Sequence, residues 1–241
     1  MQLADQRLPL YQRLRDEIAR KIAERVWAPG DPIPSEADLA ATHNVAIGTV
    51  RKAIETLAGE GLLERVQGRG TFVRRPNFES SLFRFLRFQD SHGRHAVPES
   101  WILSRDCVAG PADVVRALGL PDGARVIRIL RQRLLEKRPV LAEEIWLSEE
   151  LFRPLLILSG EEIGALLYPS YEQHCGQIVA YAEETLTVEP VDQPYASILG
   201  LPVDTPVVLI ERLARGYLGQ ALEWRRSRAA ASTFRYHVEI R

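Results

Sequence analysis

Small, polar and cationic side chains gather on one side of a helical stretch that begins near residue 47. The residues on that side are Gly48, Thr49, Arg51, Lys52 and Glu55. The major groove of DNA admits one helix, and the first turns of that helix approach the base edges. This face therefore indicates sequence-specific DNA recognition, and the alternative is a helix used for protein contacts.

A further cation stands in the tight turn Gln67-Gly68-Arg69-Gly70. The glycines permit the turn and let its backbone approach another surface closely. Arg69 can then reach a phosphate or a minor groove. Strand-like residues flank the turn at 62–66 and 71–73, which predicts a hairpin.

Two arginines follow apolar residues in a β-rich run. Because side chains alternate along a strand, one face of this run carries Ile127, Ile129, Arg131 and Arg133. Adjacent buried guanidiniums are costly unless an anion or carboxylates neutralise them. Glu143 and Glu223 could supply that charge, or could hold hydroxyls or an amine of a metabolite whose acid group binds the arginines. The alternative is a buried Arg–Glu network without a ligand.

Helical patterns in the sequence position the polar helix face near residue 47 and the turn that contains Arg69. Ser35 and Asp38 form an N-terminal capping pattern after Pro34. The next helix has apolar residues at the spacing of a buried face, namely Val50, Ala53, Ile54 and Leu57. An earlier helix is expected to bury Leu10, Leu14, Ile18 and Ile22. With the hairpin, these elements predict a winged helix-turn-helix.

This stretch resembles the GntR family of bacterial transcription regulators. The matching pieces are Pro34-Ser35-Glu36, Leu39-Ala40, Thr49-Val50-Arg51, Gly61-Leu62 and Gly68-Arg69-Gly70-Thr71-Phe72-Val73. The chain departs from the family at Ala37, where relatives often carry an arginine, and at Ala46-Ile47, where they usually carry a Ser-Arg pair. The resemblance implies binding to double-stranded operator DNA. The candidate DNA-binding residues are Ser35, Glu36, Gly48, Thr49, Arg51, Lys52, Arg69, Gly70 and Thr71.

An internal repeat organises the second half of the chain. The sequence Ala117-Leu118-Gly119-Leu120-Pro121 returns as Ile198-Leu199-Gly200-Leu201-Pro202, 81 positions later. Each copy ends a short helix, because glycine suits the left-handed position after a helix and proline prevents its continuation. A β-rich run, a turn and a further strand with a glutamate follow each copy. The repeat predicts an antiparallel sheet with pseudo-twofold symmetry and helices on one side.

This layout resembles the UTRA effector domain of the HutC-type branch of the GntR family, which shares its fold with chorismate lyase. The resemblance covers roughly residues 80–241. It implies an effector held over the sheet, and the candidate residues are Arg131, Arg133, Glu143, Tyr168 and Glu223. Leu166 and Ala229 stand where sugar-phosphate sensors carry hydroxyls, which favours a smaller or more apolar carboxylate.

Composition and charge agree with two domains. Of the 241 residues, 1–76 contain 12 Lys and Arg against 10 Asp and Glu, a net charge of +2. Residues 77–241 contain 19 against 22, a net charge of -3. Two distant cysteines, the lack of a leader and the lack of a long apolar run favour a reducing cytoplasm and no membrane contact. We expect an α+β protein, with a winged helix-turn-helix at 1–76 and a chorismate-lyase-like antiparallel sheet domain with helices, for effector binding and dimerisation, at 77–241.

The sequence therefore predicts a cytoplasmic, homodimeric, ligand-responsive transcriptional regulator that is not an enzyme. Repression is preferred over activation, with release by a small anionic metabolite. No catalytic residue, metal site or cofactor is predicted, since no activated nucleophile, ligand spacing or cofactor loop appears. Two alternatives stay open. One is an enzyme that acts on a small carboxylic acid with the lyase-like domain, and the other is a DNA-binding protein whose effector site no longer functions.

Overall fold

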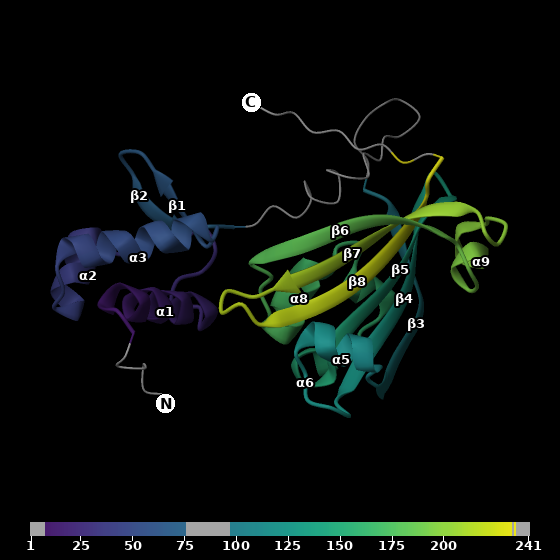
Figure 1. Cartoon of the computed structure of the whole chain (residues 1–241), viewed down its shortest axis with the longest axis horizontal. Coiled ribbons are helices and arrows are strands. Elements are labelled where there is room, and N and C mark those ends of the chain that lie inside the picture. The colour runs from purple at the N-terminus through teal and green to yellow at the C-terminus, as the bar shows by residue number, and fades with distance from the viewer. Residues whose placement is uncertain (1–7, 76–96, 233, 235–241) are drawn as a thin grey trace. The chain divides into compact units, whose positions relative to one another are not determined.

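The computed structural model describes residues 8–75, 97–232 and 234. Contacts divide the chain into two compact units, one formed by residues 1–76 with 215–219 and the other by 77–214 with 220–241. Each unit is described by itself (Figure 1). The expected boundary at 76/77 borders residues 76–96, which lie outside the described residues, so the domain limits stay a prediction. None of the helices in the described residues combines the length and apolar composition that crossing a bilayer requires.

The N-terminal unit consists of three helices and a two-stranded hairpin. These elements are α1 (Leu10–Ala23), α2 (Glu36–His43), α3 (Ile47–Gly59), β1 (Leu63–Val66) and β2 (Gly70–Val73). In α3 the four expected residues, Val50, Ala53, Ile54 and Leu57, are buried, which confirms the predicted inner face. In α1 the prediction holds for three of four positions. Leu10 is 56% exposed, because it begins the helix and α1 buries Ala19 instead.

The turn and the hairpin follow the sequence signals closely. The Ser35 hydroxyl caps α2 by accepting a hydrogen bond from the Asp38 amide at 3.2 Å. Asn44 ends α2 in the left-handed conformation, with φ of 50°, which an asparagine side chain tolerates. The hairpin pairs Leu63 with Val73 and Val66 with Gly70. The cap of α2, its left-handed end and the hairpin register together place the exposed side of α3 and the tip of the hairpin in one small unit.

The C-terminal unit is a six-stranded sheet with short helices. Its strands are β3 (Glu99–Ala109), β4 (Arg125–Leu135), β5 (Arg138–Ser148), β6 (Tyr181–Pro190), β7 (Pro206–Arg215) and β8 (Ala221–Ala230). They lie in the order β3-β4-β5-β8-β7-β6. The helices are α5 (Ala112–Leu118), α6 (Glu149–Phe152), the 3-10 helix η1 (Arg153–Leu156), α7 (Gly160–Ile163), α8 (Leu167–Cys175) and α9 (Tyr195–Leu199).

The strand order confirms the repeat. Two runs of three consecutive strands meet where β5 pairs with β8. Along this central pair, Glu143 lies opposite Ser227, and Leu147 lies opposite Glu223. A shift of 80 positions converts the first pair into the second, so the pairing register obeys the same pseudo-twofold symmetry. Gly119 and Gly200 end α5 and α9 with φ of 64° and 66°, as the repeated Leu-Gly-Leu-Pro sequences predict.

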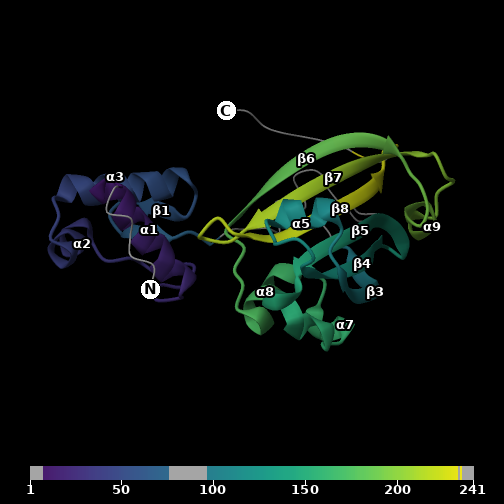
Figure 2. The ribbon, with the colours of Figure 1, turned by 60° about the horizontal axis from the view of Figure 1, so that its bottom comes forward.

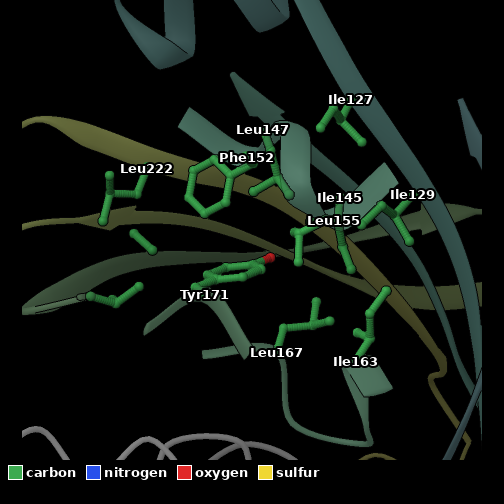
Figure 3. Close-up of a cluster of buried hydrophobic side chains, with 12 residues drawn as sticks. Ile127, Ile129, Ile145, Leu147, Phe152, Leu155, Ile163, Leu167, Tyr171 and Leu222 are labelled. Carbon is green, nitrogen blue, oxygen red and sulfur yellow. The ribbon is translucent and has the colours of Figure 1, made fainter. Parts of the chain in front are cut away.

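Helices cover both faces of the sheet, so the expectation of helices on one side is wrong. On one face Trp146 packs with Val114 and Leu118 of α5, and Ala142 packs near α9. In the view of Figure 2, α5 is drawn near the middle of the sheet and α9 beyond its right-hand end, so the two helices cover separate parts of that face. On the other face Leu147 packs with residues of α6, η1, α7 and α8, including Phe152, Leu155, Ile163 and Tyr171 (Figure 3). The physical reason is that β5 is central and stays buried on both faces from Leu141 to Ser148.

Candidate functional site

The recognition side of α3 is available to solvent. Gly48, Arg51 and Lys52 are exposed and Thr49 is partly buried, as their place opposite the buried face requires. The Lys52 ammonium lies 4.1 Å from the centre of the Tyr11 ring, so this cation also ties α3 to α1. Arg51 and Lys52 thus give the exposed face a positive charge beside two small residues.

Glu36 links two arginines on this surface. Arg51 Nε donates to Glu36 Oε2 at 3.1 Å, and Arg65 Nη2 donates to Glu36 Oε1 at 2.9 Å. Arg65 was not among the predicted contacts. The signal that could have found it is the hairpin register, because Arg65 lies opposite Thr71, which was predicted. Ser35 and Glu36 have structural partners here, and their DNA contacts stay predictions.

The hairpin presents its arginine as expected from the glycines. Gly68 and Gly70 adopt φ of 73° and 120°, which other residues rarely tolerate. Arg69 is exposed, and its guanidinium lies 5.6 Å from the centre of the Phe72 ring. Gly70 is exposed and Thr71 is partly buried. The unit therefore offers one cation at the hairpin tip and others near the start of α3.

The second candidate site is a cluster of charged side chains on one face of the large sheet. Its row of paired residues crosses three strands, from Arg131 on β4 through Glu143 on β5 to Ser227 on β8. Side chains at every second position share this face. The alternation places Arg133 beside Arg131, and Glu223 and Arg225 beside Ser227.

Glu143 is fully buried, and both of its carboxylate oxygens accept hydrogen bonds. Arg131 Nε donates to Oε2 at 2.7 Å, and Arg131 Nη2 lies 2.6 Å from the same oxygen. The other oxygen, Oε1, accepts from Ser227 Oγ at 3.2 Å and from Arg225 Nη1 at 3.4 Å. Arg133 Nη1 is farther away, at 3.9 Å from Oε2.

Glu223 forms the other centre of the cluster. Its Oε2 accepts from Tyr171 Oη and from Arg225 Nη2, both at 2.6 Å. Its Oε1 accepts from Tyr168 Oη at 3.2 Å. The two tyrosines come from α8, so this helix carries donors onto the sheet. Arg225 joins the two glutamates, and the five predicted effector residues therefore belong to one cluster.

Arg212 and Arg225 were missed by the sequence reasoning. Arg212 donates from Nε to Glu184 Oε1 at 2.6 Å and from Nη1 to Tyr168 Oη at 3.3 Å. The repeat contained the signal for it, because Arg212 follows Arg131 by the same 81 positions. Strand alternation contained the signal for Arg225, which lies two residues after Glu223.

Burial and charge act in opposite directions on these groups. Burial of Glu143 disfavours its charge, but attraction to Arg131, Arg225 and Arg133 outweighs burial and holds the pKa of this carboxyl well below its usual range. Burial is the main reason that the pKa of Arg133 is lowered to about 10, and repulsion by Arg131 and Arg225 adds to it against the attraction of Glu143. Arg133 is therefore the least compensated cation in this cluster.

Hydrogen bonding identifies the same residue. Arg133 is 1% exposed, and among the described residues its Nε and Nη1 have no hydrogen-bond partner. Its Nη2 donates to the Pro98 carbonyl at 2.9 Å. Four guanidiniums, of Arg131, Arg133, Arg212 and Arg225, face three carboxylates, of Glu143, Glu184 and Glu223. Within the described residues, Arg131, Arg133 and Arg225 around Glu143 and Glu223 therefore leave one positive charge in excess.

Substitution separates the structural arginine from the uncompensated one. Arg131→Met should lower the free energy of unfolding by about 3–5 kcal/mol. The substitution removes the arginine whose Nε and Nη2 both contact the buried carboxylate of Glu143. Arg133→Met should leave the free energy of unfolding unchanged or raise it. A base with a lowered pKa penalises the folded state wherever the group is protonated, so at pH 7 its removal relieves that penalty. Urea denaturation of both variants at pH 7 tests this, and an equal loss in both would make Arg133 a structural member of the network.

Comparisons with known proteins agree with both units. The family described as "Bacterial regulatory proteins, gntR family" matches residues 10–73, and the UTRA domain matches residues 93–235. The transcriptional repressor NagR of Bacillus subtilis (strain 168) is 27% identical over 235 residues, which cover 96% of each chain. The mannosyl-D-glycerate transport/metabolism system repressor MngR of Escherichia coli (strain K12) is 26% identical over 233 residues, which cover 96% of this chain and 95% of MngR.

A solved structure supports the assignment of the C-terminal unit to the UTRA domain. The ligand-binding domain of a GntR-family transcriptional regulator from Bordetella bronchiseptica is 28% identical, has a TM-score of 0.58, and covers 66% of this chain and 98% of its own. NagR and MngR are both named as transcriptional repressors, and members of this family are DNA-binding regulators rather than enzymes. The chain therefore belongs to the GntR family of bacterial regulatory proteins, with a winged helix-turn-helix unit followed by a UTRA domain.

Proposed function

We propose that this protein is a homodimeric repressor that binds operator DNA through its N-terminal unit and releases it when a small anion binds its UTRA domain. The observation that carries the proposal is the excess positive charge of the buried cluster, centred on Arg133. A regulator that needed no ligand would gain nothing from an uncompensated buried guanidinium, because such a group lowers stability.

The exposed side of α3 supports the DNA-binding part. Arg51 lies in the turns of α3 that follow Gly48 and Thr49, where a recognition helix contacts base edges. Arg69 at the hairpin tip suits a phosphate or minor-groove contact. Arg65 adds a cation beside Arg51, through their shared partner Glu36. DNA phosphates can replace the Glu36 carboxylate as the partner of either arginine.

The buried cluster supports the effector part. Guanidinium groups with free N–H donors bind carboxylates and phosphates well, and two N–H donors of Arg133 have no hydrogen-bond partner among the described residues. The relative MngR is named for mannosyl-D-glycerate, a molecule with a carboxylate, which fits an anion-binding role for this domain. The apolar residues beside Arg131 and Arg133, Ile127 and Ile129, favour a compact acid.

Substitutions in the N-terminal unit should separate base recognition from phosphate contact. Arg51→Ala should weaken operator binding by about 1–3 kcal/mol if it contacts a guanine edge. Arg69→Ala should weaken binding to most sequences alike and reduce the salt slope by roughly one. Fluorescence anisotropy with a selected operator and an unrelated duplex measures both effects. Unchanged operator affinity of Arg51→Ala at moderate salt would contradict this docking of α3.

Dimerisation should be necessary for tight operator binding. One recognition helix and one hairpin make few base contacts, and the N-terminal unit carries a net charge of only +2. Two units on a twofold dimer would read a palindrome, with half-sites about one helical turn apart or closer. Residues 1–76 alone should therefore bind far more weakly than the full chain. Equal affinity of the two proteins, measured on the same operator, would remove the need for a dimer.

The effector should oppose DNA binding through Arg133. An acid at a hundredfold excess over its dissociation constant should stabilise the protein by roughly 2.7 kcal/mol. By linkage, an acid that weakens operator binding must itself bind the DNA complex less tightly. Arg133→Ala should retain operator binding but lose the response, which gives a repressor that cannot be induced.

The measurement is a titration of the operator complex with a panel of small carboxylates, using wild type and Arg133→Ala side by side. Arg153→Ala is a matched control, because Arg153 is an exposed arginine of the same domain that pairs with Glu149 outside the buried cluster. If wild type and Arg133→Ala released the operator DNA at the same acid concentration, the effector would bind outside the buried cluster.

A further inference from the structure

Arg225 occupies an unusual position in the repeat. On the central strand pair it lies directly opposite Ile145, and the shift of 80 positions that relates the two halves also relates these two residues. The symmetry therefore leads from an isoleucine in the first half to an arginine in the second. Arg225 is 4% exposed, and Ile145 belongs to the apolar cluster on this face. The second half of the repeat therefore has a charged side chain, Arg225, at the position where the first half has the apolar Ile145.

One guanidinium consequently bridges both glutamates. Arg225 Nη2 lies 2.6 Å from Glu223 Oε2, and Nη1 lies 3.4 Å from Glu143 Oε1. Its guanidinium carbon also lies 5.7 Å from the centre of the Tyr168 ring. With Arg131, Ser227, Tyr168 and Tyr171 as further donors, each of the four carboxylate oxygens has at least one hydrogen-bond donor.

The groups left over in the cluster are donors. They are Arg133 Nε, Arg133 Nη1 and Arg225 Nε, which are buried and have no hydrogen-bond partner among the described residues. Three N–H donors next to two neutralised carboxylates suit a group that only accepts hydrogen bonds. An ammonium at the same place would meet positive charge and no unpaired carboxylate, and a buried charge without a partner is strongly disfavoured.

We infer that Arg225 determines ligand class: it takes the place at Glu143 and Glu223 that an amine of a ligand would need, so the site binds carboxylates without an ammonium group and rejects α-amino acids. This inference rests on the proposed effector site and specifies it further. The sequence had left open whether the glutamates hold an amine of the metabolite. In the structure, Arg225 already supplies that cation from within the chain.

Matched ligand pairs test the inference on the full-length wild type. The pairs are 3-phenylpropionate with L-phenylalanine, 4-methylpentanoate with L-leucine, and propionate with L-alanine. Each pair shares its carbon skeleton and differs in the α-amine. The expected result is that at least one acid raises the melting temperature by several degrees, that its amino counterpart does not, and that Arg133→Ala abolishes the rise.

The outcomes distinguish the inference from the function on which it rests. A rise with an amino acid equal to that with its acid would overturn the role of Arg225 but keep the acid-binding site. No rise with any acid or amino acid would overturn the proposed effector site, and the inference with it. A rise in melting temperature that persists in Arg133→Ala would place the bound acid outside this cluster. It would also overturn the proposed effector site and the inference.

A variant of Arg225 provides the converse test. Arg225→Met removes the cation at similar length, so both glutamates lose a partner and the selectivity should shift at least tenfold towards the amino acid of the pair. Arg226→Met is the control, because Arg226 is the next residue on β8, faces the other side of the sheet and pairs with Glu211 and Asp113. Arg225→Gln, a neutral hydrogen-bonding replacement, serves if Arg225→Met does not fold. Wild-type selectivity in the folded Arg225 variant would refute the inference.

Discussion

The C-terminal domain depends on how one buried carboxylate is neutralised. Glu143 has no exposed surface and lies at the centre of the sheet, where an unpaired charge would cost several kcal/mol. Arg131 and Arg225 approach its two oxygens from the neighbouring strands, and each is itself buried. The register of β4, β5 and β8 is therefore constrained electrostatically as well as sterically. A shift of one residue would turn these charges to the opposite face, among the apolar side chains of α5 and α9.

The repeat supplies symmetric architecture but asymmetric chemistry. Arg131 and its counterpart Arg212 both pair with a glutamate, although Arg212 uses Glu184 of β6. Arg133 corresponds by the same shift to Ala214, which is buried and apolar. The first half thus holds the uncompensated cation, and the second half holds the bridging Arg225. The unpartnered N–H donors are correspondingly uneven, with two on Arg133 in the first half and one on Arg225 in the second. The proposed effector would therefore meet an asymmetric set of donors on a symmetric scaffold.

The sequence predicted local features well and contacts across the sheet less well. The buried face of α3 was found because helical spacing identifies it without knowledge of the fold. The shared face of Arg131 and Arg133 was found because strand alternation is equally local. The two-sided covering of the sheet was missed, because a strand that is buried on both faces loses the alternation that shows which side is covered. The repeat and strand alternation place Arg212 and Arg225 on the sheet, but the roles of these two arginines and of Arg65 come from partners on other elements, which local patterns do not show.

The charge distribution explains why the proposed regulation can act through geometry. A unit of net charge +2 holds DNA weakly through phosphates alone, and Glu36 already occupies part of its positive surface. Operator affinity in a dimer then depends on both units meeting their half-sites together, since the second contact benefits from the effective concentration set by the first. A ligand need not weaken any protein–DNA contact to release such a repressor. It is sufficient that the liganded domains favour a separation at which only one half-site can be reached, because avidity is lost when simultaneous contact is geometrically excluded.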